Sequence, residues 1–240
     1  MSDLNDRRIR LLKAIVEEYV RTAEPVGSKN LVRRYKLRIS PATVRNEMAV
    51  LVEDGFLDQP HTSAGRIPAP MGIRYYIRSI MEEEEMPVLE EVAVKQRLLE
   101  LKDDYALLLR SAVRALADRT ELAAVAVLEN DLLLGSGIVH LLDNPEFYDI
   151  DVTRSVLTTL DNATLLREIF SKGGAEDLVH VLIGDEIGMA NFQEIGAVFA
   201  EFNLGGQSGT LAVFGPCRMS YPSVIPTVRY ISTLLNEFSV

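Results

Sequence analysis

The chain has 240 residues, of which 48% are hydrophobic and 25% charged, and a formal net charge of −10. This composition is typical of one or two globular domains and excludes wholesale disorder. No uncharged apolar run approaches the roughly 18 residues of a bilayer span, and we expect no secretory signal in the charged N-terminal residues. We therefore expect a cytoplasmic chain with no membrane partner. The single cysteine, Cys217, excludes an intrachain disulfide.

The charge is unevenly distributed along the chain. Residues 1–80 carry 14 Lys and Arg against 9 Asp and Glu, whereas residues 81–240 carry 11 against 26. A basic segment joined to an acidic one suggests an anionic partner for the basic part, and DNA is the obvious candidate. The excess over residues 1–80 is mild, so charge alone leaves an ordinary surface equally open.

The first third of the sequence predicts three helices. They are expected over residues 6–22, 29–35 and 41–54. Ser28 is expected to cap the second helix, and Ser40 followed by Pro41 is a strong start signal for the third. Two short helices joined by a turn of about four residues fit a helix-turn-helix, in which the second helix contacts base edges.

The third helix has a face suited to DNA. Val44, Met48 and Leu51 form its buried stripe, and the opposite side carries Ala42, Thr43, Arg45, Asn46 and Ala49. Small side chains permit close approach to a groove, and the polar ones can bond bases or phosphates. An ordinary amphipathic surface helix has the same pattern, so that alternative remains open.

Residues 56–68 predict a strand, a polar tip and a second strand, followed by a helix over 72–81. A β-wing beside a recognition helix needs such a tip. Gly65 would let the backbone approach a phosphate, and Arg66 would enter a minor groove. The hydroxyls of Thr62 and Ser63 would bind backbone oxygens.

Beyond the acidic run 82–85, which we interpret as a domain boundary, residues 88–119 predict one long helical pattern. Its a/d seam comprises Val94, Leu98, Leu101, Tyr105, Leu108, Ala112 and Ala115. The stripe is wider than that of a strict coiled coil. We therefore expect it to pack partly on its own domain and partly across a dimer.

The remaining residues predict an α+β domain. Strands are expected over 122–128, 132–142, 178–183, 195–202 and 210–214, and helices over 151–160, 163–170 and from Ser220 or Ser223 to about 238. Gly205 and Gly206 are expected in a hairpin turn, because no lysine-bearing helix start follows them.

The sequence carries no catalytic, cofactor or metal signature. Phosphate-loop, dinucleotide and nucleophile-elbow motifs are absent, and the histidines His61, His140 and His180 are scattered. Asp185 and Glu186 are adjacent acids whose side chains should point apart. An enzyme is therefore disfavoured, with no catalytic residue, cofactor or metal ligand expected.

Three stretches resemble one family, HrcA, the bacterial heat-inducible transcription repressors. The first comprises residues 25–28, 40–48 and 59–68, with the unusual run PHTSAGRIP; the others are LLDNPEF at 141–147 and GPCRMSYPSVIP at 215–226. The resemblance implies a winged helix-turn-helix joined to a GAF-like domain. It also implies a homodimer that binds the CIRCE inverted repeat upstream of chaperone operons, loses activity on heating, and has the GroEL chaperonin as a partner.

The chain departs from this family in length. The missing stretch is expected between about Ala124 and Gly135, where relatives carry half of the GAF-like sheet and an inserted dimerising subdomain. We therefore expect the dimer to be held by the 88–119 seam together with what remains of the sheet.

The prediction is a DNA-binding domain over 1–86, a linking and dimerising helix over 87–120, and an abbreviated GAF-like domain over 121–240. Base contacts are assigned to Ala42, Thr43, Arg45 and Asn46, and backbone or minor-groove contacts to Lys29, Ser40, His61, Thr62, Ser63 and Arg66. Two alternatives stay open: a winged-helix transcription factor gated by a small ligand, and an adaptor that uses the same fold for protein contacts.

Overall fold

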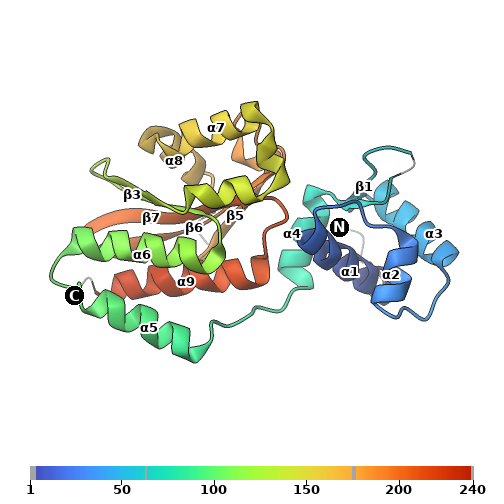
Figure 1. The fold of residues 1–240 in the computed structure, drawn as a ribbon, viewed down its shortest axis with the longest axis horizontal. Coiled ribbons are helices and arrows are strands. Elements are labelled where there is room, and N and C mark those ends of the chain that lie inside the picture. Colours follow the sequence, from blue (N-terminus) through green and yellow to red (C-terminus); the bar gives the residue numbers. More distant parts are fainter. Residues whose placement is uncertain (1–3, 63, 175–176, 239–240) are drawn as a thin grey trace. The chain divides into compact units, whose positions relative to one another are not determined.

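The computed structural model describes residues 4–62, 64–174 and 177–238 (Figure 1). The chain divides into two compact units, Met1–Glu82 and Glu83–Val240. The division falls inside the run of four acidic residues. The two units are described separately below.

Unit 1 consists of four helices and a short antiparallel pair of strands. Its elements are α1 (Asp6–Thr22), α2 (Ser28–Arg34), α3 (Pro41–Glu53), β1 (Leu57–Asp58), β2 (Ile67–Pro68) and α4 (Pro70–Ser79). All four helices were expected. The N-termini of two helices differ from the prediction. The N-cap of α2 is Gly27, so Ser28 is a buried residue of the first turn. Helix α4 begins earlier than expected, because Pro70 suits a first helical position.

The core of unit 1 forms where the apolar stripes of α1, α2 and α3 meet. Its central members are Leu12, Ile15, Leu31, Val44 and Leu51, each fully buried. An ion cluster adds to this contact between α1 and α2, because the buried Glu18 carboxylate lies 2.6 Å from Arg21 and 3.0 Å from Arg34. The helices of unit 1 are therefore held by both apolar and ionic contacts.

Unit 2 is an α+β unit, as expected. Its helices are α5 (Val88–Leu99), α6 (Tyr105–Thr120), α7 (Ile150–Leu160), α8 (Ala163–Phe170) and α9 (Tyr221–Glu237), with short 3-10 helices η1 (Ile138–Asp143), η2 (Pro145–Tyr148) and η3 (Gly184–Ile187). Its strands are β3 (Ala123–Leu128), β4 (Leu133–Ser136), β5 (His180–Ile183), β6 (Ile195–Leu204) and β7 (Gln207–Pro216). They form one antiparallel sheet in the order β4-β3-β7-β6-β5.

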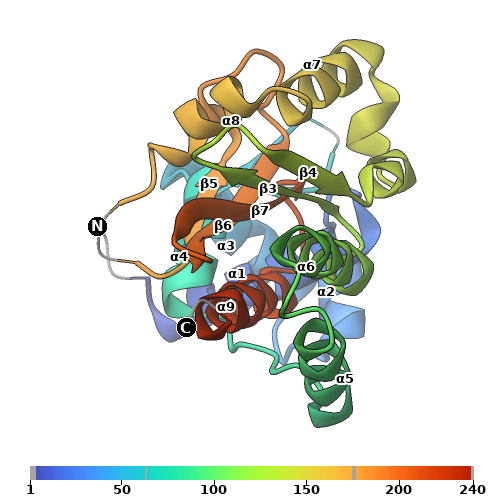
Figure 2. The ribbon, with the colours of Figure 1, turned by 90° about the vertical axis from the view of Figure 1, so that its left-hand side faces the viewer.

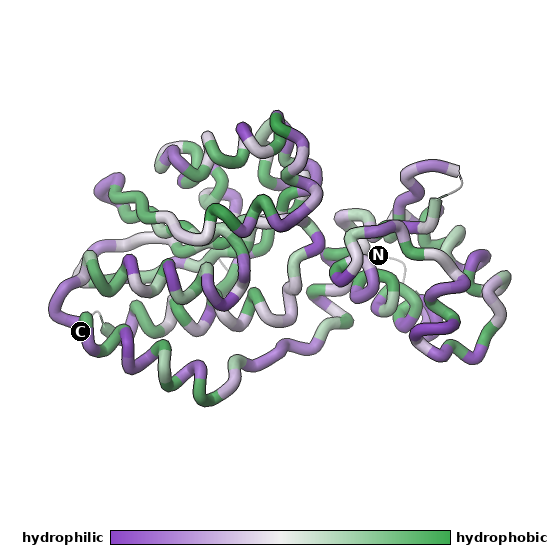
Figure 3. The backbone as a smooth tube through the Cα atoms, viewed as in Figure 1, coloured by the Kyte–Doolittle hydropathy of each residue, from purple (hydrophilic) through white to green (hydrophobic). Residues whose placement is uncertain are grey.

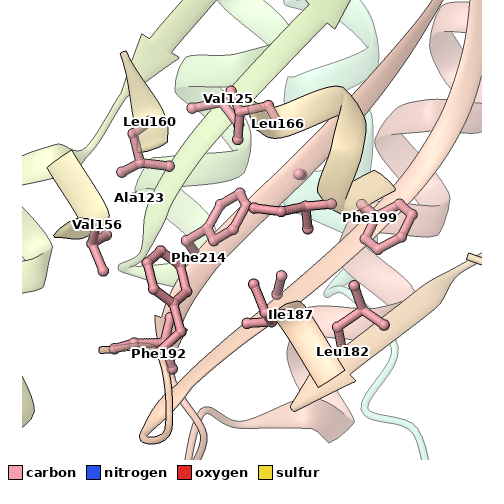
Figure 4. Close-up of a cluster of buried hydrophobic side chains, with 14 of the residues drawn as sticks. Ala123, Val125, Val156, Leu160, Leu166, Leu182, Ile187, Phe192, Phe199 and Phe214 are labelled. Atoms are coloured by element: carbon pink, nitrogen blue, oxygen red, sulfur yellow. The ribbon is translucent and has the colours of Figure 1, made fainter. Parts of the chain in front are cut away.

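The sheet of unit 2 is the middle of three layers. Helices α6 and α9 cover one face, and α7, α8 and the 3-10 segments cover the other (Figure 2). On the second side Phe192, Phe199 and Phe214 pack against Leu160 and Leu166 (Figure 4). Because β3 is buried along its whole length, it carries a continuous apolar run rather than an alternating one.

The β6–β7 hairpin turns at Gly205 and Gly206, which confirms the expected turn. Both have positive φ, +60° and +76°, as a two-residue hairpin loop requires. The ladder is continuous from the pair Leu204–Gln207, so both strands are longer than expected.

Two expectations for unit 2 are wrong. The single helix over 88–119 is interrupted at residues 100–104, where Asp104 accepts bonds from the amides of Ala106 and Leu107 and starts α6 as a new helix. The strand expected over 132–142 ends at Ser136, because Gly137 has φ +71° and begins η1.

The part of the chain that the structure describes contains no helix long and apolar enough to span a membrane. Within the same residues no three acidic, histidine or cysteine side chains are grouped as a metal site.

Candidate nucleic-acid interface

Helix α3 has the buried and exposed faces that its sequence predicts. Its N-cap Ser40 accepts a hydrogen bond from the Thr43 amide at 3.1 Å, and the two hydroxyls are 2.9 Å apart. Val44, Met48 and Leu51 are buried. Ala42, Arg45 and Asn46 are exposed and Thr43 is half-buried. The predicted base-contacting residues thus lie together on the first two turns of one accessible helix.

Ionic contacts attach α3 to the start of α1. Glu47 lies 3.2 Å from Arg7 and 2.9 Å from Arg8, and Arg8 also lies 3.9 Å from Asp54. The Glu47 carboxylate is mostly shielded from solvent. These contacts limit rotation of α3 about its axis and therefore help to present Arg45 outward.

Strand β1 contacts α3 and strand β2 contacts α1 and α4, and the segment between the two strands carries a polar tip. Gln59 holds the tip by donating to the Thr62 carbonyl at 2.9 Å, and the Ala64 amide donates to the His61 carbonyl at 2.8 Å. The side chains of His61 and Thr62 are exposed. Ser63, also predicted to contact DNA, lies outside the described residues.

Gly65 lies against the backbone just before α2. A Cβ at this position would lie 2.5 Å from the Val26 carbonyl oxygen and 2.7 Å from the Pro25 carbonyl carbon. The glycine therefore permits a close backbone contact within unit 1, and its approach to a phosphate stays a prediction.

Arg66 joins the tip to the start of α2. Its amide and carbonyl exchange bonds of 3.0 and 2.8 Å with Val26. Its guanidinium donates to the carbonyls of Ala64 and Gly65 at 3.3 and 3.4 Å. To reach a minor groove, the Arg66 side chain must break its hydrogen bonds to these carbonyls and form new ones to DNA.

A second group of cations was missed by the sequence analysis. A groove of about 500 Å³ lies between the start of α1 and the α2–α3 turn, lined by Asp6, Arg7, Arg10, Leu11, Lys36, Leu37, Arg38 and Ile39. The sequence feature that could have predicted this group is the presence of four cationic residues within positions 33–38. Lys36 and Arg38 are exposed and immediately precede the N-terminus of α3, where the helix dipole adds positive potential. Lys29 is also exposed, on the first turn of α2.

In unit 2 the second and third family stretches meet at a buried ion pair. Arg218 donates to both carboxylate oxygens of Glu146, at 2.6 and 3.0 Å, and to Asn144 Oδ1 at 3.0 Å. The two charged side chains are only 11% and 9% exposed. The adjacent Cys217 is desolvated, which raises the pKa of its thiol to about 12. These contacts connect η2 to the segment between β7 and α9.

Comparison with curated proteins defines the class of this chain. A protein of Pelotomaculum thermopropionicum is 27% identical over 336 residues, covering 98% of this chain and 96% of the relative. One of Symbiobacterium thermophilum is 28% identical over 337 residues, covering 98% and 99%. Both are named heat-inducible transcription repressor HrcA. The class is that of the transcription repressors.

The family assignment rests on a direct match. The sequence model described as the HrcA protein C terminal domain matches residues 76–225. The chain belongs to the HrcA family. The alignments extend over about 336 residues although this chain has 240, so the relatives carry residues that it lacks.

A solved structure shares the fold. A crystal structure at 2.2 Å resolution, described as that of a hypothetical protein, superposes with a TM-score of 0.77. Its sequence is 20% identical, and the match covers 99% of both chains. The likeness shows that the fold of this chain occurs in an experimentally determined protein.

Proposed function

We propose that this chain is a heat-inducible repressor that binds the CIRCE inverted repeat as a homodimer and silences chaperone operons. The observation that carries this proposal is the exposed face of α3, with Ala42, Arg45 and Asn46 accessible beside a cation-lined groove. In the proposal unit 1 is a winged helix-turn-helix, α3 is its recognition helix and the β1–β2 segment is its wing.

The proposed contacts divide into two kinds. Ala42, Thr43, Arg45 and Asn46 would face base edges, because they occupy the exposed first two turns of α3. The second kind would position the DNA backbone or enter the minor groove: Lys29, Ser40, His61, Thr62, Ser63 and Arg66. Lys36 and Arg38 join this second group, since both are exposed just before α3.

The remaining parts have proposed roles as well. The helices after the boundary would link and dimerise the chain, and residues 121–240 would form an abbreviated GAF-like domain that senses heat and contacts the GroEL chaperonin. A repressor of marginal stability suits this switch, since a loss of a few kcal/mol changes the active fraction many-fold.

The test is binding of the purified full-length chain to a labelled CIRCE duplex and to a scrambled duplex, across a salt series and at growth and heat-shock temperatures. We expect specific binding that weakens with salt, because phosphate contacts release counterions, and that weakens further on heating. Equal, weak binding to both duplexes, unchanged by added chaperonin, would contradict the proposed operator.

A small-molecule sensor is a second candidate that one observation favours. A hollow of about 450 Å³ in unit 2 lies at the end of the sheet, where Arg167, Glu201, Asn203 and Asn236 are among its lining residues. Its size is in the range of ligand sites, although its lining is more polar than usual. A thermal-shift screen with small anions and polar metabolites tests this candidate, and a ligand that alters DNA affinity would support it.

A further inference from the structure

Helix α5 has almost no partner within its own chain. Of its twelve residues only Leu98 is buried. The other contacts along the same side are polar: Lys95 to Glu237 at 3.0 Å, Glu90 to Arg119 at 3.1 Å, and the Glu91 carbonyl to the Tyr230 hydroxyl at 2.9 Å. An isolated helix of this length is marginal in water, so a helix that buries one leucine is expected to pack on something else.

The seam predicted from the sequence cannot provide that contact. Leu98, Leu108 and Ala112 are fully buried inside unit 2, and Ala115 is nearly so. The exposed apolar side chains of α5 form a different stripe. Leu89 is 85% and Val92 56% exposed, and Val88 and Leu99 are exposed as well. In Figure 3, α5 accordingly shows both hydrophobic and hydrophilic turns.

This exposed stripe has the spacing of a helix-pairing seam. Leu89, Val92, Gln96 and Leu99 are separated by three, four and three residues, the alternation that keeps side chains on one line between two paired helices. Leu98 points to another side of the helix, toward unit 2. The helix therefore has one face for its own chain and one for a partner.

The flanking charges select the partner and its direction. Lys95, whose pair with Glu237 is half-exposed and borders the seam, precedes the seam residue Gln96, and Glu100 follows the seam residue Leu99. Between two parallel copies of α5, position 95 of one faces position 100 of the other. Lys95 of each copy therefore lies beside Glu100 of the other, and the two charges attract. An antiparallel pair instead places each flanking edge of the seam beside the same edge of the partner, so Lys95 would no longer face Glu100 and the pairs of opposite charge would be lost. A polar seam residue such as Gln96 further favours an in-register pair.

We propose that α5 pairs in parallel with α5 of a second copy of this chain through Leu89, Val92, Gln96 and Leu99, in place of the dimer contact predicted along residues 88–119. This proposal deepens the proposed function and rests on it, because a repressor of an inverted repeat needs a two-fold dimer. Residues 83–87 connect unit 1 to the N-terminus of α5. Parallel pairing therefore tethers both DNA-binding units at the same end of the helix pair.

The interface is small. About three turns from each copy bury far less than the ~1,600 Å² of a standard interface, which places this dimer among weak ones. Binding to two half-sites of one operator raises the effective concentration of the copies and compensates for the weak contact. We therefore expect a dissociation constant in the micromolar range without DNA.

The first test is sedimentation equilibrium of the full-length chain without DNA, at protein concentrations from about 1 to 100 µM. We expect a monomer–dimer equilibrium that Val92→Glu weakens by roughly tenfold or more. The matched control is Ile150→Glu, which places the same charge on a residue of similar exposure, 65%, at the start of α7. A wild type that stays monomeric, or a dimer that Val92→Glu leaves unchanged, overturns the proposal.

The second test examines the parallel register. Gln96→Cys places two thiols opposite each other across the seam, whereas the control Arg97→Cys lies outside it. Both variants are made in a Cys217→Ser background, so that the native thiol cannot take part in cross-linking. We expect a disulfide-linked dimer under mild oxidation from Gln96→Cys alone. Equal cross-linking of both variants, or of neither, would refute the parallel pair.

The third test exchanges the charges. Glu100→Lys is expected to weaken the dimer, and the double variant Lys95→Glu/Glu100→Lys to restore it, because both cross-pairs regain opposite signs. Glu237→Gln is the control for the intrachain pair of Lys95 and should leave the dimer unchanged. Failure of the double variant to recover would exclude the proposed pairing of charges.

DNA binding separates this proposal from the proposed function. Val92→Glu is expected to bind a single half-site as the wild type does and to lose the additional affinity for the complete inverted repeat. A wild type that dimerises through α5 but binds neither duplex would contradict the proposed function and leave the dimer supported.

Discussion

At the residue scale, two arginines illustrate opposite uses of the same side chain. Arg45 is exposed on α3, so its planar guanidinium is available to a base edge. Arg218 is buried and bonded to both oxygens of Glu146, so its charge is satisfied inside the protein. The environment, rather than the residue type, decides whether an arginine serves recognition or structure.

Replacing Arg45 with alanine should weaken operator binding by about 1–3 kcal/mol and relax specificity at one base position, because a base-reading arginine discriminates as well as attracts. Fluorescence anisotropy with the operator and single-base variants measures both effects. Arg78→Ala removes an exposed cation from α4 and is the matched control. Unchanged affinity for Arg45→Ala would remove this residue from the interface.

Replacing Arg218 with methionine should destabilise the protein by about 3–5 kcal/mol, because it leaves the Glu146 carboxylate buried and unpaired. Urea unfolding followed by circular dichroism measures the free energy of unfolding. The control is Arg154→Met, which breaks an exposed pair with Asp151 and should cost at most about 1 kcal/mol. Equal losses in the two variants would contradict the structural role of the buried pair.

At the element scale, the α2–α3 turn and the start of α3 act together. The turn carries Lys36 and Arg38, and α3 begins immediately after it with Ser40 as its cap. A phosphate near this point would meet both side-chain cations and the positive end of the helix dipole. The element thus provides affinity that does not depend on the base sequence.

The double variant Lys36→Ala/Arg38→Ala should weaken binding to all duplexes alike and reduce the slope of log affinity against log salt by about 1 for each phosphate that the protein no longer neutralises. Titrations across a series of salt concentrations give the slope. Lys102→Ala/Arg110→Ala removes two exposed cations from unit 2 and should leave the slope as in the wild type. A weakening confined to the specific duplex would instead assign the two residues to base recognition.

At the scale of the whole molecule, the proposed response to heat depends on a weak dimer whose copies each have two units with separate hydrophobic cores. Unit 1 holds its helices around Leu12, Ile15 and Leu51, and unit 2 holds its sheet around Phe199 and Phe214. Neither core depends on α5 pairing. We therefore expect heat to separate the two copies before either unit unfolds.

On heating, the dimer should dissociate at a temperature below the loss of helical circular dichroism, and this temperature should rise with protein concentration. The reason is mass action, since dissociation produces two particles from one. Light scattering and circular dichroism, recorded at about 2 and 50 µM, separate the two events. Coincident transitions that do not move with concentration would show that heat acts by unfolding the monomer.

Much of this protein was determined by local sequence. Helix starts such as Ser40–Pro41, the buried stripe of α3 and the Gly205–Gly206 hairpin follow from hydrogen-bonding and steric rules that act within a few residues. The α+β class and the family resemblance follow from patterns of the same kind. These features could be predicted because their causes are adjacent in the chain.

Tertiary structure decided the rest. The break between α5 and α6 is a local exception, because Asp104 caps a new helix through the next residues while the apolar periodicity of residues 88–119 continues. Gly65 is needed because Val26, far away in sequence, lies against it. The pairing of Arg218 with Glu146 and the exposure of Leu89 and Val92 depend equally on which distant segments meet. Sequence periodicity shows which residues avoid water, whereas only the folded chain shows which of them its own core has already covered.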